Sequence, residues 1–187
     1  LTDQDNLYGA IEFYKECKKQ GIKPIIGVDL YVAPRPRHDK EHRIDNKTSR
    51  LILLAKNIAG YRNLVKLVSR AHLEGFYYTP RADRELITEY HSDLIAILPS
   101  FASEPSQHLK EGDRERADES LAWYRETFGS DLYAEITHHP EIENHEERMR
   151  AWGAFAKERS VPLVAAHDVY YMKPEDALAR ELVVKIK

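Results

Sequence analysis

Short apolar segments alternate with amphipathic segments along this chain. The apolar segments are rich in β-branched and other large aliphatic residues, which is typical of β-strands. They occupy residues 24–32, 51–55, 94–98, 132–136 and 162–166. Most are almost continuously apolar, as expected for strands that are covered on both faces in a parallel sheet.

Between these strands, apolar residues recur at the spacing of one face of an α-helix. The first such stripe runs from Leu7 to Cys17, with Gly21 as a stop signal. Further stripes lie at 61–71, 117–128, 149–156 and 182–186. The alternation of strands and helices with short connections predicts an α/β domain with a largely parallel sheet, open or closed as a barrel.

Length and composition limit the classes of protein. A chain of 187 residues fits one domain with a substantial core. A formal net charge of −3 excludes a basic footprint for nucleic acid across the whole chain. No apolar run is long enough to cross a membrane, and no signal peptide is evident. The single cysteine, Cys17, is expected to be a buried thiol, compatible with a cytoplasmic location.

One long polar segment interrupts the alternation at residues 34–48. Its basic residues are Arg35, Arg37, Lys40, Arg43 and Lys47. A loop this long is usually functional or disordered. Contact with phosphate is one interpretation, but a solvated, mobile excursion is the expectation.

Candidate acid–base and metal-binding side chains gather at strand ends. They are Asp3, Asp5, Asp29, the pair His138-His139 and the pair His167-Asp168. Metal sites need several such donors to converge, and barrels supply them from the carboxyl ends of strands. Helix capping is the alternative role for Asp3 and Asp5. Asp83 and Glu85 are expected on a solvated helix face.

Several segments together resemble one known family. They are residues 1–10, 21–32, 51–57, 60–69, 75–81 and 167–177, and they include Gly-Phe-Tyr-Tyr-Thr-Pro-Arg and Leu-Leu-Ala-Lys-Asn. In order and spacing they are similar to the PHP (polymerase and histidinol phosphatase) domain of the alpha subunit of bacterial DNA polymerase III. The resemblance covers nearly the whole chain.

The resemblance implies a distorted (β/α)7 TIM-like barrel of the PHP type. It further implies that residues 1–187 are a PHP domain truncated at its N-terminus, with the first strand and its His-x-His motif upstream. The polymerase domain, with the carboxylates that hold magnesium, would follow downstream. The chain itself would therefore lack a polymerase site, and no catalytic residue is expected in it.

The resemblance also identifies the positions that hold metal in other members. In this chain these degenerate metal-site positions are Asp3, Gln4, Asp29, Arg50, Ser100, Asp168 and Tyr170. Gln4, Arg50 and Tyr170 stand where metal-bearing members have histidine. Ser100 replaces a cysteine or histidine, and Asp29 replaces a glutamate.

These replacements weaken the donor set, so no metal and no other cofactor is expected in the chain. Neutral glutamine, serine and protonated tyrosine are poor ligands for zinc or manganese, and arginine repels a nearby cation. A guanidinium at Arg50 among Asp3, Asp29 and Asp168 would instead neutralise carboxylates through fork-like ion pairs. The alternative is that Arg50 lies at the surface beside the 34–48 loop.

Three functions are compatible with these residues. The favoured one is an inactive scaffold that stabilises the rest of a replicative polymerase chain, meets DNA only through that polymerase and docks the proofreading exonuclease. The second is an active phosphoesterase with zinc or manganese and 3′–5′ exonuclease or pyrophosphatase activity. The third is an unrelated α/β barrel enzyme, which the segment matches disfavour.

Overall fold

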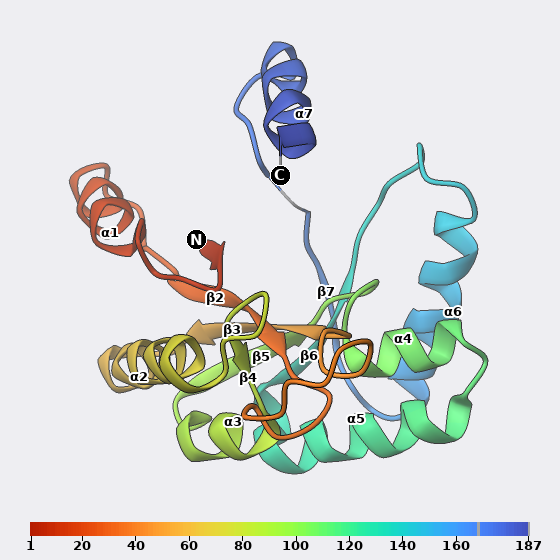
Figure 1. Ribbon diagram of the computed structural model, residues 1–187. Coiled ribbons are helices and arrows are strands. Elements are labelled where there is room, and N and C mark those ends of the chain that lie inside the picture. The colour runs from red at the N-terminus through yellow and green to blue at the C-terminus, as the bar shows by residue number, and fades with distance from the viewer. Residues whose placement is uncertain (168, 187) are drawn as a thin grey trace.

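A single mixed sheet forms the centre of the molecule in the computed structural model, which describes residues 1–167 and 169–186 (Figure 1). Its strands are β1 (Thr2–Gln4), β2 (Gly27–Val32), β3 (Ser49–Ala55), β4 (Arg81–Ala82), β5 (Leu94–Leu98), β6 (Leu132–Ile136) and β7 (Leu163–Ala165). They follow the order β1-β2-β3-β5-β6-β7, and β4 pairs with β2 outside this path. The predicted strands at 94–98 and 132–136 have the observed bounds, and the other three are found with shifted ends.

Most neighbouring strands are parallel, as predicted, and β3 runs against both of its neighbours, β2 and β5. The amino end of β3 therefore lies at the same edge as the carboxyl ends of β1, β2, β5, β6 and β7. Tyr31 near the end of β2 is paired with Arg50 at the start of β3. This edge brings the degenerate metal-site positions of different strands towards each other.

Helices cover the sheet and connect its strands. They are α1 (Ala10–Lys19), α2 (Ile58–Glu74), α3 (Arg84–Tyr90), α4 (Glu104–Lys110), α5 (Arg114–Phe128), α6 (His145–Glu158) and α7 (Ala177–Ile186), with short 3₁₀ turns η1 (Gly129–Asp131) and η2 (Pro174–Asp176). The apolar stripes predicted α1, α2, α5, α6 and α7. The helix face expected at Asp83 and Glu85 corresponds to α3. Only α4 was not predicted, because it is too short to display a clear stripe. None of the described helices is long and apolar enough to cross a membrane.

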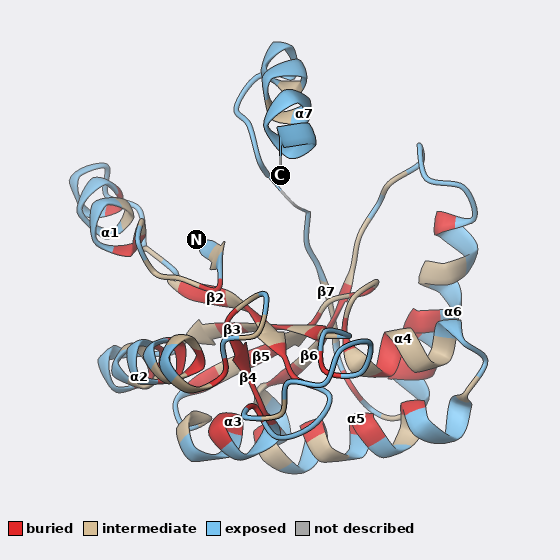
Figure 2. Ribbon diagram, viewed as in Figure 1, coloured by how far each residue is buried: buried red, intermediate tan, exposed pale blue. Residues whose placement is uncertain are grey.

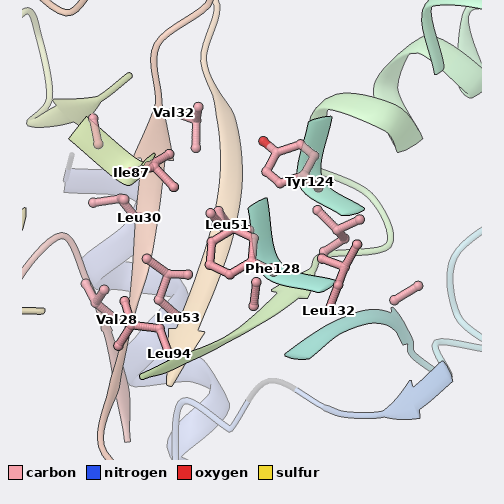
Figure 3. Close-up of a cluster of buried hydrophobic side chains, with 14 of the residues drawn as sticks. Val28, Leu30, Val32, Leu51, Leu53, Ile87, Leu94, Tyr124, Phe128 and Leu132 are labelled. Carbon is pink, nitrogen blue, oxygen red and sulfur yellow. The ribbon is translucent and has the colours of Figure 1, made fainter. Parts of the chain in front are cut away.

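The two faces of the sheet differ in burial. One face packs against α2, α3 and α5 and forms the apolar core, in which Ile87, Tyr124 and Phe128 lie over the strands (Figures 2 and 3). Its strand residues are Val28, Leu30, Val32, Leu51, Leu53, Leu94, Ala96 and Leu98. The opposite face is only half-buried and carries Asp29, Tyr31, Arg50, Ile52, Ile95 and Ile97. Polar side chains are therefore placed on the face that a closed barrel would enclose.

The sheet is open between its two end strands. No pairing joins β1 to β7 within the described residues. The α/β class is confirmed, while closure into a barrel by a further strand stays a prediction.

Two helices lie apart from the sheet in Figure 1, α1 at the upper left and α7 at the top. On α1 the predicted apolar stripe buries Ala10 and Cys17, whereas Ile11 and Tyr14 are exposed. On α7 the apolar residues Leu178, Leu182, Val183, Val184 and Ile186 are all exposed (Figure 2). The prediction of a buried Cys17 is confirmed.

The 34–48 loop is held in place by arginines and is not simply a solvated excursion. Arg37 and Asp45 are 3% and 1% exposed. The fully buried guanidinium of Arg81 donates hydrogen bonds to four backbone carbonyls, those of Gly75, Arg37, Asp39 and Asp45, at 2.6–3.1 Å. Because four carbonyls share one guanidinium, Arg81 fixes the loop against the 75–81 turn.

The expectation for Asp83 was wrong, and that for Glu85 was right. Asp83 is the N-cap of α3, and its Oδ1 accepts a hydrogen bond from the backbone N–H of Leu86 at 3.0 Å. Its carboxylate also pairs with the buried Arg37 at 3.0 Å. Glu85 has a side chain that is 79% exposed. The partner that buries Asp83 comes from a loop far away in the sequence, so local periodicity gave no sign of it.

Candidate functional site

Arg50 and Asp29 form the centre of the site on the half-buried face of the sheet. Arg50 Nε donates to Asp29 Oδ1 at 2.9 Å, and Arg50 Nη2 contacts Asp29 Oδ2 in the second arm of a fork. Nη2 also reaches the backbone oxygen of Asp29 at 3.3 Å. The guanidinium lies 4.1 Å from the ring centroid of Tyr31, its partner across the strand pair. The ion-pair hypothesis is confirmed for Asp29, and the alternative of an Arg50 at the open surface is wrong.

Asp5 is the second carboxylate of the site, and it is 8% exposed. Its Oδ1 accepts the backbone N–H of Tyr31 at 3.0 Å, and its own N–H donates to the oxygen of Asp29 at 3.0 Å. Its carbonyl oxygen lies 2.7 Å from Nε2 of His72 on α2. Burial raises the pKa of Asp5 to about 6, while the Tyr31 N–H and the charge of Arg50 oppose the rise.

The raised pKa of Asp5 predicts a pH-dependent stability. A carboxyl group with a higher pKa in the folded chain stabilises it most below pH 3.8, and this contribution is lost as the pH rises through about 6. Asp5→Asn keeps the acceptor for Tyr31 and does not titrate. Relative to the unchanged chain, the variant should gain about 1–2 kcal/mol of unfolding free energy between pH 4 and pH 7.5. Urea denaturation of both proteins at pH 4 and at pH 7.5 measures this gain. If the variant differed from the unchanged chain by the same free energy at both pH values, the prediction would be contradicted.

Of the other predicted positions, Gln4 is the register partner of Asp29 across the β1–β2 pair. The carboxylate of Asp3 accepts the N–H of Gly9, the residue before α1, at 3.4 Å, but α1 has no side-chain cap, so Asp3 does not cap this helix. Gln4 is exposed. Tyr170 is 54% exposed, with the guanidinium of Arg180 at 4.0 Å from its ring. The predicted position Asp168 lies outside the described residues.

Ser100 is buried and bound to a carboxylate that the sequence analysis did not single out. Its N–H and its Oγ donate to Oε2 of Glu135 at 3.1 and 3.3 Å. Glu135 is 7% exposed and stands in the otherwise apolar strand β6. A lone charged residue inside an apolar strand was the signal that could have identified it.

Histidine rings gather beyond the ends of β6 and β7. The rings of His139 and His167 stack with centroids 4.6 Å apart, and that of His145 lies 5.3 Å from His139 at a steep angle. Nε2 of His145 contacts the oxygen of Thr137 at 2.9 Å. Both members of the predicted pair His138-His139 lie in the connection that follows β6, which ends at Ile136.

The donors present in the described residues do not fit a two-metal cluster. Asp29 is engaged by a permanent cation, Ser100 by Glu135, and Gln4 is exposed. The described part of the chain contains no group of three or more histidine, cysteine or acidic side chains placed to hold a metal ion. Arginine cannot give up its proton, so Arg50 supplies the positive charge at Asp29 itself.

Comparison with known proteins gives consistent matches. The family described as PHP domain matches residues 1–139. The chain is 40% identical, over its whole length, to DNA polymerase III subunit alpha of Borreliella burgdorferi, of which it spans 16%. It is 38% identical to the protein of the same name from Chlamydia trachomatis, again over its whole length, and spans 17% of it. The chain thus covers about one sixth of these relatives.

Proposed function

The chain belongs to the PHP domain family, in the branch found in DNA polymerase III subunit alpha, and from that premise we propose that it serves DNA replication as a metal-free, non-catalytic scaffold within a bacterial replicative polymerase. The polymerase site, with its magnesium ions, would lie in the remaining part of such a protein. This assignment also implies a cytoplasmic location, where chromosomal DNA is copied.

The Arg50–Asp29 ion pair is the observation that carries the proposal. A water on clustered metals is the nucleophile of a metal-dependent phosphoesterase, so that activity needs free carboxylates and imidazoles around the cation. Here the guanidinium occupies the carboxylate of Asp29 by a fork-like contact and adds a cation–π contact with Tyr31. Both contacts stabilise the fold, and the guanidinium supplies at Asp29 the positive charge that a metal ion would otherwise supply.

The proposed partner of the scaffold is first of all the rest of the polymerase chain. A groove between α2 and the connection after β1 is lined by apolar residues that include Leu7, Tyr8, Val65 and Leu73. Tyr8 and Leu73 are each 84% exposed. Exposed apolar side chains that lie together are suited to burial against another protein surface. The proofreading exonuclease is the second proposed partner, and DNA is reached through the polymerase.

The test is a metal analysis of the full-length polymerase that carries this domain, together with a variant of the ion pair. Purified protein is expected to contain no stoichiometric zinc, manganese or iron. Arg50→Ala should lower the unfolding free energy of the chain by about 1–3 kcal/mol, because the half-buried Asp29 loses its charged donors. Arg50→Lys keeps the positive charge but cannot form the fork-like contact, so its unfolding free energy should lie between those of the unchanged chain and of Arg50→Ala.

Stoichiometric metal together with a chelator-sensitive 3′–5′ exonuclease or pyrophosphatase activity would overturn the scaffold proposal in favour of an active phosphoesterase. An Arg50→Ala variant as stable as the unchanged chain would show that the ion pair has no role in the fold. Loss of DNA synthesis by the full-length protein after substitution of its polymerase site alone would support the assignment to a replicative polymerase.

A further inference from the structure

The 34–48 loop contains both paired and unpaired charges. Arg35 contacts the acidic residues Asp39, Glu41 and Asp45 at 2.7–3.9 Å, and of these three side chains only that of Asp45 is buried, while those of Asp39 and Glu41 are 44% and 60% exposed. Among its basic residues, Arg37 is buried and paired as well. The loop cations that remain are Lys40, Arg43 and Lys47, which are exposed and form no ion pair within the described residues. A protein with a net negative charge thus presents a local group of free cations on an ordered loop.

Aromatic side chains stand on the segment next to these cations. Arg81 binds the oxygens of Asp39 and Asp45 in the loop and the oxygen of Gly75 at the start of the 75–81 turn. This turn carries Phe76, 52% exposed, and Tyr78, 67% exposed.

The side chain of Tyr77, between Phe76 and Tyr78 in the sequence, is held in place by its neighbours. Tyr77 lies with its ring centroid 5.2 Å from the Arg81 guanidinium and 4.7 Å from the ring of Tyr78. The position of Tyr78 is therefore fixed by its neighbour, while much of its own ring remains open to solvent.

Each of the two segments contains one residue in an unusual backbone conformation. Tyr78 and Arg43 adopt positive φ angles of 62° and 69°, as do Asp5, Asp93, Asn144 and Ser160 elsewhere in the described chain with φ of 57–61°. A bulky side chain in the left-handed region is unfavourable, and such conformations are found both in turns and at sites that contact a ligand.

From this arrangement we propose that the 34–48 loop and the 75–81 turn form a binding surface for single-stranded nucleic acid. Lys40, Arg43 and Lys47 would contact successive phosphates, and bases would stack on Tyr78 and Phe76. Cations that follow the backbone, next to aromatic rings that accept any base, are the combination by which proteins bind single strands without sequence preference. Three exposed cations without an ion pair favour a polyanionic partner over an apolar protein surface.

The choice of DNA as the nucleic acid rests on the proposed function. A replicative polymerase handles a single-stranded template ahead of the primer end, so the surface would bind that template. The surface shares no residue with the Arg50–Asp29 site, and its role does not depend on whether that site binds metal.

The experiment measures DNA binding by the full-length polymerase through fluorescence anisotropy. One probe is a primer–template with a long single-stranded template extension, and the other is the same duplex with blunt ends. Lys40→Gln/Arg43→Gln/Lys47→Gln should reduce the slope of log affinity against log salt by about 2 on the first probe, because each phosphate contact to a single strand contributes about 0.7. Tyr78→Ala should weaken binding to it by about tenfold, and Tyr78→Phe should restore it. Binding of the blunt duplex should not change.

The matched control removes the same charge from another exposed part of the chain. Lys15→Gln/Lys18→Gln/Lys23→Gln, on and just after α1, should leave the affinity for both probes unchanged. In addition, an iododeoxyuridine oligonucleotide should photo-crosslink to the peptide that contains Phe76 and Tyr78, and mass spectrometry identifies it.

Equal losses in the two triple variants, equal losses on the two probes, or a crosslink elsewhere with none at 76–78 would overturn the binding surface. Those results would leave the proposed function intact as long as the full-length protein still extends primers. Failure of the unchanged full-length protein to extend primers would instead refute the proposed function.

Discussion

Arg81→Ala is expected to lower the unfolding free energy of the chain by about 3–5 kcal/mol. The guanidinium is fully buried and donates to the backbone oxygens of Gly75, Arg37, Asp39 and Asp45. Without it these oxygens lose their charged donor, and an unsatisfied buried acceptor costs about 1–3 kcal/mol. The cost is below the sum of four such terms because the loop can open and expose some of them to water.

Urea denaturation followed by circular dichroism measures this loss, and limited proteolysis tests its location. Cleavage should begin within residues 34–48, which Arg81 no longer fixes. Arg81→Lys is the control: it keeps the charge but cannot reach all four oxygens from one point, so an intermediate loss is expected. A loss below about 1 kcal/mol for the alanine variant would contradict the role of Arg81, since that is the range of an ordinary surface substitution.

Asp83→Ala is the second substitution with a large expected effect, again about 3–5 kcal/mol. The carboxylate of Asp83 makes two separate stabilising interactions. It caps α3 through the N–H of Leu86, and it accepts bonds from the backbone and guanidinium of Arg37. Alanine removes the cap and leaves the buried charge of Arg37 with only the partly exposed Glu74 and the exposed Glu85.

Asp83→Asn separates the helix cap from the ion pair with Arg37, because asparagine is as good an N-cap as aspartate but carries no charge. It should cost about 1–2 kcal/mol less than alanine, a difference that reports the cap. Thermal denaturation of the three proteins measures both steps. Equal stability of the alanine and asparagine variants would show that the cap contributes nothing and that the charge alone matters.

The regular elements could be predicted where local pattern and burial agree. The apolar runs at 94–98 and 132–136 correspond to β5 and β6 without any shift. The long amphipathic stripes gave α2 and α5. The short helix α3 was expected only through the face at Asp83 and Glu85, and α4 was not predicted, because a helix of about two turns does not repeat its apolar spacing often enough to be recognised.

The candidate site was predictable only in part. The resemblance identified Arg50 as a replacement for a histidine, and the charge of arginine alone suggested carboxylate partners. The antiparallel pairing of β3 with β2 decided that Asp29 is the partner. The same pairing places Tyr31 under the guanidinium.

The sequence by itself determined the family and the α/β class, because these depend on residue identity and local order, and it predicted replaced metal ligands at several positions through the family resemblance. The tertiary structure decided which charges meet. It buried Asp5, bound Ser100 to Glu135 and turned the 34–48 loop from a presumed excursion into a segment fixed by Arg81. Burial and ion pairing depend on groups that are distant in the sequence, and no local periodicity encodes the register that brings them together.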